Sequence, residues 1–483
     1  MLEKITIFSK VLISKSAKYT LIRPSKISQV RSRKQGKNAS RRPACLHQSS
    51  SLVEFHERTT TIYKYVGELE YPLISMASVI YVSTGDNKLA AVEVDSNGDL
   101  VRILQVVEPV VDPLPPTLPE NAKGALAVTE WISRHPKYPL LYALTSFRNE
   151  AEAIVTTYRI DSANGTLTKL GSSSTSTGGH QAAHAVFSPD GSTYVIAHHN
   201  GGALSLFDAT KPDKLGEPVM VIFPPEIETG TKKAPEAGKV NQGLPALHGV
   251  SYAPDGRFLV CADPVQNAVF TYAVDKQGIP TTPDKPTSQV VCETSKWAYA
   301  WVQRLLAFVL KMKSPRPRRA VVHPNGKWLY VIHEWTNYVQ IYAIDDDGNI
   351  DPKLHGEVSC VDPSLRRGFV GIGMTAVAEL EACDDYLMVS VRGLAVLGGR
   401  AESSVRLLAY KNGGSELESA GVLEGVPAAV RHFYRKEDVI WVGINSSKKT
   451  LVLKYEREDG KNWVRKGEAD VGMDVFCVVP KDI

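Results

Sequence analysis

Arg318 and Glu334 are the residues of this chain whose types and spacing first suggest chemistry. They stand eight residues either side of Gly326 in RPRRAVVHPNGKWLYVIHEWTN, residues 316–337. Apolar residues run into a Pro-Asn-Gly turn and out again, which predicts a β-hairpin with the two charges nearly opposite each other at its open end. A guanidinium beside a carboxylate can bind an anionic substrate and transfer a proton. The pair can also be a cross-strand ion pair that only holds the hairpin end, worth under about 1 kcal/mol if exposed.

Short β-type runs like the second half of this hairpin recur seven times along the chain. They lie at 79–87, 140–149, 193–201, 258–267, 328–337, 386–393 and 439–447. One apolar residue in each run serves as an anchor, and the spacings between anchors are 61, 53, 65, 70, 58 and 53 residues. The anchors are Ile80, Leu141, Tyr194, Leu259, Leu329, Leu387 and Ile440.

This repeat predicts an all-β fold, a seven-bladed β-propeller. Most runs are followed by a second alternating run, and three are preceded by a run that ends in Pro-Asp-Gly or Pro-Asn-Gly. The amphipathic helices that a parallel α/β array would need are not found. GMDVFCVVP at 472–480 resembles the first strand of a unit but has no partner after it. We therefore expect the C-terminal strand to pair with the N-terminal strand of the first blade and close the ring.

The open ends of the hairpins should gather around one mouth of the ring. Five residues after each anchor stand Gly85, Ser146, His199, Pro264, Glu334, Arg392 and Asn445. His248 and Arg318 stand at the starts of the preceding strands, with His184 one position off register. Repeats should carry similar residues at equivalent positions, yet these diverge into charged and polar types that the scaffold does not need. The divergence predicts a site, although His248 alone also fits a core or turn-capping histidine and Arg392 alone a solvated charge.

Two segments fall outside the repeat. Residues 1–75 precede the natural start of the propeller at Met76, and the first 50 residues hold twelve Lys or Arg and one acid. This basic extension fits a mitochondrial transit peptide, a disordered arm, or upstream sequence translated only in a gene model. Residues 292–314 are helical in character and interrupt the fourth unit, as a surface insertion or a retained intron. The propeller is expected over 76–483.

Composition and charge exclude several function classes. A formal net charge of +4 is too small to indicate nucleic-acid binding. The six cysteines form no CxxC pair, so we expect buried thiols in a reducing compartment: the cytoplasm, or the mitochondrion if residues 1–50 are a transit peptide. The most apolar helical stretch, 297–312, is too short to span a membrane and contains Arg304 and Lys311. The sequence does not indicate the oligomeric state.

The histidines His184, His198 and His199 do not form a recognisable metal motif. HxH or HxxxH spacing with a nearby carboxylate is absent, and adjacent histidines on a strand point to opposite faces. No Walker loop, dinucleotide fingerprint or GxSxG elbow is present. We therefore expect neither a metal nor a cofactor.

The chain resembles the seven-bladed lactonase family, which contains 6-phosphogluconolactonases and fungal carboxy-cis,cis-muconate cyclases. The resemblance covers roughly 76–483 and rests on LHGVSYAPDGRFLVCAD, RPRRAVVHPNGKWLYVIHE and LMVSVRG. It implies that His248, Arg318, Glu334 and Arg392 match a His-bearing strand, a Pro-Arg strand leading to a Glu, and a Ser-x-Arg. The hydrolase branch often reads Gly-Pro-Arg-His where this chain has Arg-Pro-Arg-Arg at 316–319, and Ala246 replaces the first of two histidines.

Two reactions fit these four residues. In lactone hydrolysis Glu334 is the expected base, with His248 as its partner or as the acid for the leaving alkoxide. Arg318 and Arg392, with His199 and Asn445 nearby, would bind an anionic lactone or polycarboxylate. Cycloisomerisation of a muconate-type substrate needs the same groups, and hydrolysis is placed first because it is the broader class in this family. A non-catalytic propeller that binds a protein through exposed aromatics such as Trp335 and Tyr338 is the third hypothesis.

Overall fold

The computed structural model describes thirteen stretches of the chain. These are residues 78–109, 127–147, 151–174, 181–213, 215–227, 246–292, 316–334, 336–361, 374–394, 403–427, 429–445, 451–460 and 462–481. The predicted extension at 1–75, Trp335, and the predicted insertion at 292–314 apart from Cys292 lie outside these residues. The domain boundaries therefore stay predictions.

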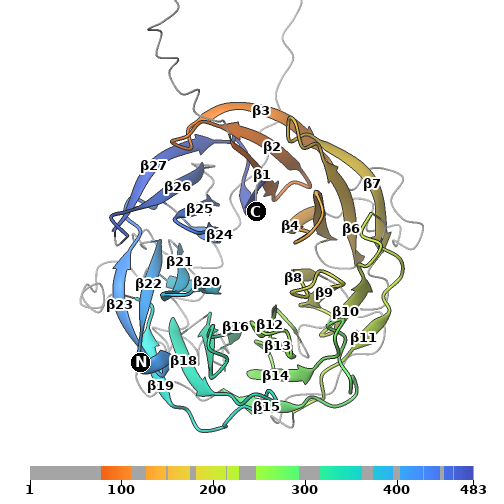
Figure 1. Cartoon of the computed structure of the whole chain (residues 1–483), viewed down its shortest axis with the longest axis vertical. Coiled ribbons are helices and arrows are strands. Elements are labelled where there is room, and N and C mark those ends of the chain that lie inside the picture. Colours follow the sequence, from red (N-terminus) through yellow and green to blue (C-terminus); the bar gives the residue numbers. More distant parts are fainter. Residues whose placement is uncertain are drawn as a thin grey trace, which may run out of the picture. The chain divides into compact units, whose positions relative to one another are not determined.

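Seven four-stranded antiparallel sheets, the blades, stand around a ring, which confirms the predicted fold class (Figure 1). Blade 1 has the order β28-β1-β2-β3, and blades 2 to 7 each take the next four strands along the chain. The strands of blades 1 to 3 are β28 (Val475–Pro480), β1 (Ser78–Thr84), β2 (Leu89–Val94), β3 (Leu100–Val107), β4 (Ala127–Arg134), β5 (Leu140–Phe147), β6 (Ala151–Ile160), β7 (Leu167–Ser174), β8 (Ala182–Phe187), β9 (Thr193–His198), β10 (Leu204–Asp208) and β11 (Met220–Ile222).

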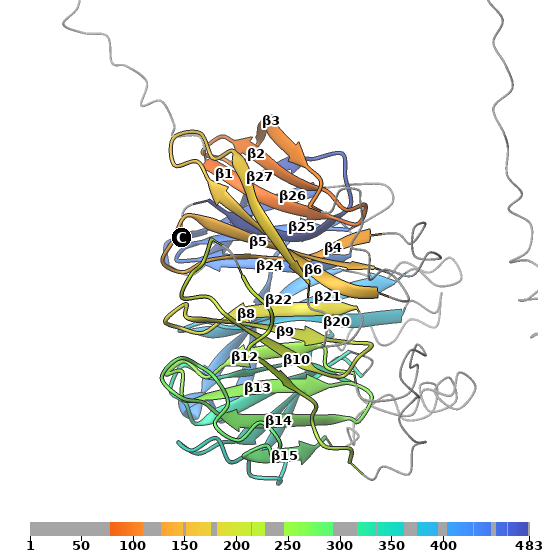
Figure 2. The same cartoon turned by 90° about the vertical axis from the view of Figure 1, so that its right-hand side faces the viewer.

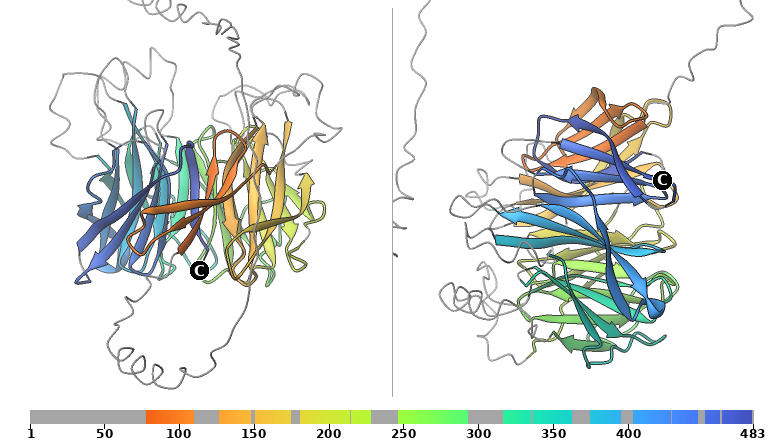
Figure 3. Two further views of the ribbon diagram at one scale, coloured as in Figure 1. Left: turned by 90° about the horizontal axis from the view of Figure 1, so that it is seen from above. Right: turned by 90° about the vertical axis from the view of Figure 1, so that its left-hand side faces the viewer.

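The remaining four blades follow the same plan. Their strands are β12 (Gly249–Tyr252), β13 (Phe258–Asp263), β14 (Ala268–Ala273), β15 (Ser288–Val291), β16 (Pro317–Val322), β17 (Trp328–His333), β18 (Tyr338–Ala343), β19 (Gly356–Ser359), β20 (Met374–Ala382), β21 (Tyr386–Leu394), β22 (Ser404–Lys411), β23 (Glu416–Val422), β24 (Val430–Lys436), β25 (Val439–Ile444), β26 (Leu451–Glu458) and β27 (Asn462–Asp470). One short 3-10 turn, η3 (Asn412–Gly414), precedes β23. Side views show the strands running from one face of the ring to the other (Figures 2 and 3).

The ring closes through the C-terminal strand, as the sequence predicts. β28 pairs antiparallel with β1, with Val82 opposite Val478 and Ser83 opposite Cys477. β28 thus takes the innermost place in blade 1, the place that β4, β8, β12, β16, β20 and β24 take in the other blades. The free edge that an unpaired C-terminal strand would present is removed.

The repeated sequence pattern has a simple structural cause. All seven anchor residues lie in the second strand of a blade with 0% of their surface exposed. Gly191, Gly256 and Gly326 end the three Pro-Asp-Gly or Pro-Asn-Gly turns with φ of 74°, 72° and 75°. This left-handed conformation suits glycine, and it lets each glycine N–H donate a 2.8 Å hydrogen bond to the carbonyl three residues earlier.

The core is divided into seven apolar clusters, one at each interface between neighbouring blades. In the cluster between blades 7 and 1, Trp441 and Val452 pack with Ile80 and Val82. The five cysteines that the structure describes are buried and unpaired, as expected. Among the described residues, no helix is long and apolar enough to cross a membrane.

Candidate active site

A β-bulge at Arg318 sets the geometry of the blade 5 hairpin. Pro317 pairs with His333 and Arg319 pairs with Ile332, so Arg318 is an extra residue with no opposite partner. The N–H of Glu334 donates to the carbonyl of Arg316 at 2.9 Å. In the backbone register Arg316 lies opposite Glu334, and the bulge places Arg318 nearby as an extra residue.

The two predicted charges nevertheless meet. Nη1 of Arg318 lies 3.0 Å from Oε1 of Glu334, and Nη2 of Arg392, from the neighbouring blade 6, lies 2.7 Å from the same oxygen. Arg316 adds a third guanidinium, with its Nε 3.7 Å from Oε2 of Glu334. Arg318 is anchored further, because its Nε donates to the carbonyl of Ala378 at 3.0 Å. We call Arg316, Arg318, Glu334 and Arg392 the ion-pair cluster.

The ion-pair cluster fixes the charge state of Glu334. Burial alone would raise the pKa of this carboxyl, but Arg318, Arg392 and Arg316 outweigh it and lower the pKa to about 2. Burial and the charge of Arg318 lower the pKa of Arg392 to about 10, which still leaves this guanidinium protonated near neutral pH. A carboxylate with so low a pKa is a weak proton acceptor, so the electrostatics argue against the expected role of Glu334 as the base.

His248 stands beside the ion-pair cluster as a neutral imidazole. Its ring centroid is 5.3 Å from that of His199, and the two rings are nearly perpendicular. Burial, followed by the charge of Arg318 and by His199, lowers the pKa of His248 well below 6.5. Nδ1 of His248 is buried and has no hydrogen-bond partner among the described residues. This nitrogen therefore has an unused hydrogen-bonding position, shielded from solvent in the folded chain.

The other predicted residues divide between the mouth and its surroundings. His199 is half-buried and its Nδ1 lies 3.1 Å from Oδ1 of Asn200, while His198 turns the other way onto Ser205, as alternation along a strand requires. Asn445 lies at the end of β25, where its N–H donates to the carbonyl of Ala429 at 2.9 Å. Within the described part of the chain, no hydrogen bond joins the Asn445 side chain to the ion-pair cluster.

Sequence reasoning missed a second set of charged residues at the mouth. Nη2 of Arg431 lies 3.0 Å from Oε2 of Glu130, and the Arg431 guanidinium carbon lies 3.8 Å from the centre of the Phe476 ring. Arg431 falls at a register shift in blade 7, Glu130 at one in blade 2, and Phe476 at one in blade 1. They therefore occupy the position that Arg318 occupies in blade 5. We call these three residues the Arg431 platform.

Counting residues backwards from each anchor could have identified the charged residues of the platform. Glu130, His248 and Arg318 all lie eleven residues before their anchors, whereas Arg431 lies nine before Ile440. The difference arises because the blade 7 hairpin is shorter: Lys436 pairs with Val439, which leaves only two residues in the turn.

One layer below the bulges, large side chains fill the centre of the ring. Trp131 of blade 2 contacts His184 of blade 3 and His432 of blade 7, with ring centroids 4.3 and 4.6 Å apart. Arg319 of blade 5 lies 4.9 Å above the Trp131 ring and is paired with Glu379 of blade 6 at 2.6 Å. A residue that touches three other blades must lie near the ring axis. Trp131 and its neighbours therefore lie near the ring axis, one layer below the bulges.

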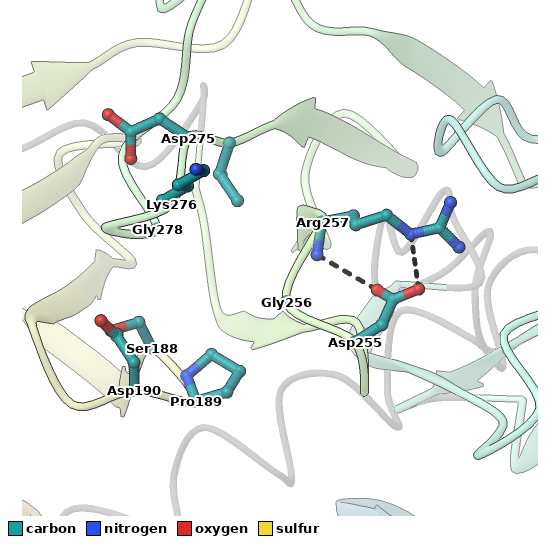
Figure 4. A pocket seen from close by; sticks show the side chains of 10 residues that line it. Ser188, Pro189, Asp190, Asp255, Gly256, Arg257, Asp275, Lys276 and Gly278 are labelled. Carbon is teal, nitrogen blue, oxygen red and sulfur yellow. Dashed lines mark hydrogen bonds and ion pairs between the residues drawn. The ribbon is translucent and has the colours of Figure 1, made fainter.

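A separate cavity of about 330 Å³ lies between the turns of blades 3 and 4 (Figure 4). It is lined by Asp190, Asp255 and Asp275, but by none of the predicted site residues. These carboxylates are occupied by turn hydrogen bonds and by Arg257, whose Nε is 2.6 Å from Asp255. The cavity therefore does not offer the chemistry that the mouth offers. The described residues include no group of three or more His, Cys, Asp or Glu that could hold a metal ion.

Comparison with known proteins gives a family match. Residues 117–294 and 309–479 match the family described as "Lactonase, 7-bladed beta-propeller". The match is interrupted at 295–308, inside the predicted insertion. Uncharacterized proteins of several Staphylococcus aureus strains are 22% identical over 236 residues, which is 49% of this chain and 55% of theirs. The chain thus spans about half the length of the curated relatives it matches.

Solved structures share the fold at low identity. A candidate 6-phosphogluconolactonase of Bacteroides fragilis is 15% identical, with a TM-score of 0.59 over 84% of this chain and 99% of that chain. The periplasmic gluconolactonase of Pseudomonas aeruginosa is 15% identical, with a TM-score of 0.58 over the same shares. A protein of Lactobacillus plantarum is 14% identical, with a TM-score of 0.60. At these identities the likeness is one of fold.

Proposed function

The chain belongs to the lactonase family of seven-bladed β-propellers, and we propose that it hydrolyses the ring ester of an anionic sugar lactone, of the kind represented by 6-phosphogluconolactone. The observation that carries the proposal is the ion-pair cluster beside His248. Two guanidinium groups from neighbouring blades share one carboxylate oxygen, next to a neutral imidazole with an unpartnered nitrogen. The names of two structural relatives, a candidate 6-phosphogluconolactonase and a gluconolactonase, agree with this class of reaction.

The charge of the mouth supports an anionic substrate. The ion-pair cluster and the Arg431 platform together carry four guanidinium groups and two carboxylates. His199 and His248 add no charge near neutral pH, because burial lowers the pKa of both. An excess of positive charge among partly buried groups attracts an anion and disfavours a cation.

We assign the proton transfers to His248. A water molecule attacks the lactone carbonyl carbon and gives its proton to the imidazole of His248, while N–H groups of Arg318 and Arg392 stabilise the oxyanion. The tetrahedral intermediate then collapses, the ring C–O bond breaks, and His248 returns the proton to the leaving alkoxide. Glu334 stays ionised, holds the two arginines in place, and offsets part of their charge. The role of base thus moves from Glu334, which its ion pairs hold ionised, to His248, whose Nδ1 has no hydrogen-bond partner among the described residues.

Direct assays test the proposal. The full chain is incubated with 6-phosphogluconolactone and, separately, with carboxymuconate, and acid release and absorbance are followed against the uncatalysed rate. We expect turnover of the lactone, and loss of that turnover in Glu334→Gln. Turnover of carboxymuconate alone would replace the hydrolase with a cycloisomerase. Turnover of neither substrate would favour a propeller that serves as a binding module.

A further inference from the structure

The Arg431 platform has no role in the hydrolytic steps assigned above, yet it is built at the same mouth. Register shifts in the innermost strands fall at Glu130, Ala183, Arg318, Ala378, Arg431 and Phe476, and His248 holds the equivalent place ahead of Gly249. Two of these seven positions carry alanine, so the propeller needs no charge or aromatic ring there. A ligand, rather than the fold, can therefore determine which residue types stand at the other five positions.

Three parts of the chain hold the Arg431 guanidinium in place. The Phe476 ring lies beneath it at 3.8 Å, a contact that favours a cation over the face of an aromatic ring. The Phe476 ring in turn depends on Gly85, since a Cβ at Gly85 would lie 2.7 Å from Cε2 of Phe476. Glu130 fixes one edge of the guanidinium at 3.0 Å. A cation oriented in this way before a ligand arrives loses little entropy on binding one.

Within the platform, the positively charged Arg431 is more exposed than the negatively charged Glu130. The Arg431 side chain is 28% exposed, whereas the Glu130 side chain is only 9% exposed. Arg431 also lies close enough to Arg392 for its charge to contribute to the lowered pKa of that residue, after burial and Arg318. The platform therefore extends the positive surface from the ion-pair cluster in blades 5 and 6 to blades 7 and 1.

We propose that Arg431, stacked on Phe476 and oriented by Glu130, binds a second anionic group of the substrate, at the end remote from the lactone carbonyl. The preferred substrate is then a lactone that carries a phosphate or carboxylate on its far side, and Arg431 is a specificity-determining residue. The inference rests on the proposed function, in that it takes the mouth as the substrate site. Its test uses ligand binding, which does not require turnover.

The ligands are 6-phosphogluconate and gluconate, the open-chain acids that differ only in the remote phosphate. Their affinities for the full chain are measured by isothermal titration calorimetry. We expect the wild type to bind 6-phosphogluconate at least about 10-fold more tightly, because a charge-assisted guanidinium contact contributes on that order. Arg431→Gln should weaken the binding of 6-phosphogluconate far more than that of gluconate, and so lose this preference. Arg257→Gln, which alters an exposed arginine outside the mouth, should keep it.

A purely structural ion pair predicts a different pattern. If Arg431 only ties blade 7 to blade 2, then Glu130→Gln and Arg431→Gln should have the same effect, a fall in melting temperature with no change in ligand preference. If Arg431 binds the anion, Glu130→Gln should strengthen the binding of 6-phosphogluconate, since it removes a competing carboxylate. Equal affinities of the two acids for the wild type, or parallel effects of the two variants, would overturn the inference. Opposite effects of the variants support it even if no lactone is hydrolysed, an outcome that would refute only the proposed function.

Discussion

The side chain of Arg319 in blade 5 lies against Gly249 in blade 4 with no room for a methyl group between them. A Cβ on Gly249 would be 2.7 Å from Cδ of Arg319 and 2.6 Å from the carbonyl oxygen of Arg318. A glycine in one blade thus permits the arginines of the next blade to reach both the mouth and the ring axis. His248, directly before this glycine, is brought beside them by the same close approach.

Gly249→Ala should therefore lower the stability of the fold and also disturb the geometry of the candidate active site. The backbone oxygen of Arg318 cannot move away without displacing the ion-pair cluster, so we expect the free energy of unfolding to fall by about 1–3 kcal/mol. We also expect lower kcat/KM. Urea unfolding and lactone assays measure both effects. Gly171→Ala is the control, because no atom lies within 4 Å of its new Cβ and its φ is not positive. Equal effects of the two substitutions would contradict the steric argument.

The substitution Glu334→Gln distinguishes a catalytic role of the ion-pair cluster from a purely structural one. Glutamine keeps a carbonyl oxygen for Arg318 and Arg392 but removes the charge that holds and offsets them. We expect kcat/KM to fall by about 10²-fold or more while the fold is retained. Glu93→Gln is the matched control, since Glu93 pairs with Arg102 at 2.5 Å in blade 1, remote from blades 5 and 6. A lower melting temperature with unchanged turnover would make the ion-pair cluster purely structural.

The pH profile tests the role of His248. Burial and Arg318 keep its pKa well below 6.5, and the proposed mechanism needs the neutral imidazole. The acid limb of kcat/KM, which reports the free enzyme, should therefore lie below the ordinary histidine pKa of about 6.5. His248→Asn should lower turnover and abolish that limb, whereas the exposed His355→Asn should change neither. An acid limb at or above the ordinary value would argue against His248 as the proton acceptor.

Stability should fall as the pH is lowered from about 6 to about 5. Burial lowers the pKa of His333 and of His432 to about 3, so below about pH 6.5 the unfolded chain binds protons that the folded chain does not. Glu381 acts in the opposite direction, because burial raises its pKa to about 8 and the folded state keeps a proton that the unfolded state loses. Below about pH 6, where both histidines are mostly protonated in the unfolded chain, they outweigh the one carboxyl, so a net loss on the order of 1 kcal/mol per pH unit is expected. Urea unfolding across this range checks the sign, and rising stability on acidification would contradict it.

Much of the fold was readable from local patterns. The anchors Ile80 to Ile440 mark buried second strands because strand burial depends on residues two positions apart, a periodicity visible in any short stretch. The C-terminal run at 472–480 stood out as a first strand without a partner, and β28 does pair with β1. His248, Arg318, Glu334 and Arg392 could be named because hairpin ends at one face of a ring are set by position along each repeat. Their roles in catalysis stay proposals.

The strand register at the mouth could not be predicted from local sequence patterns. A β-bulge adds one residue without interrupting the alternation of apolar and polar side chains that precedes it, so nothing local marks Arg318 as the extra residue. For this reason the sequence did not show that Arg316, and not Arg318, lies opposite Glu334 in the backbone register. The side chains still meet, because the arginine side chain is long and the bulge turns it toward Glu334 and Arg392.

The sequence by itself determined a closed ring of seven β-units and which residues stand at one of its mouths, because both follow from a β-run that recurs seven times along the chain, every 53 to 70 residues. Only the tertiary structure decided that Arg431 meets Glu130 across 301 residues of chain, and that Trp131 contacts His184 and His432 near the ring axis. These contacts join blades that are distant in sequence. They arise when the ring closes and brings the innermost strands around one axis, and the charge states of Glu334 and His248 follow from the burial and the neighbouring guanidinium groups that this closure creates.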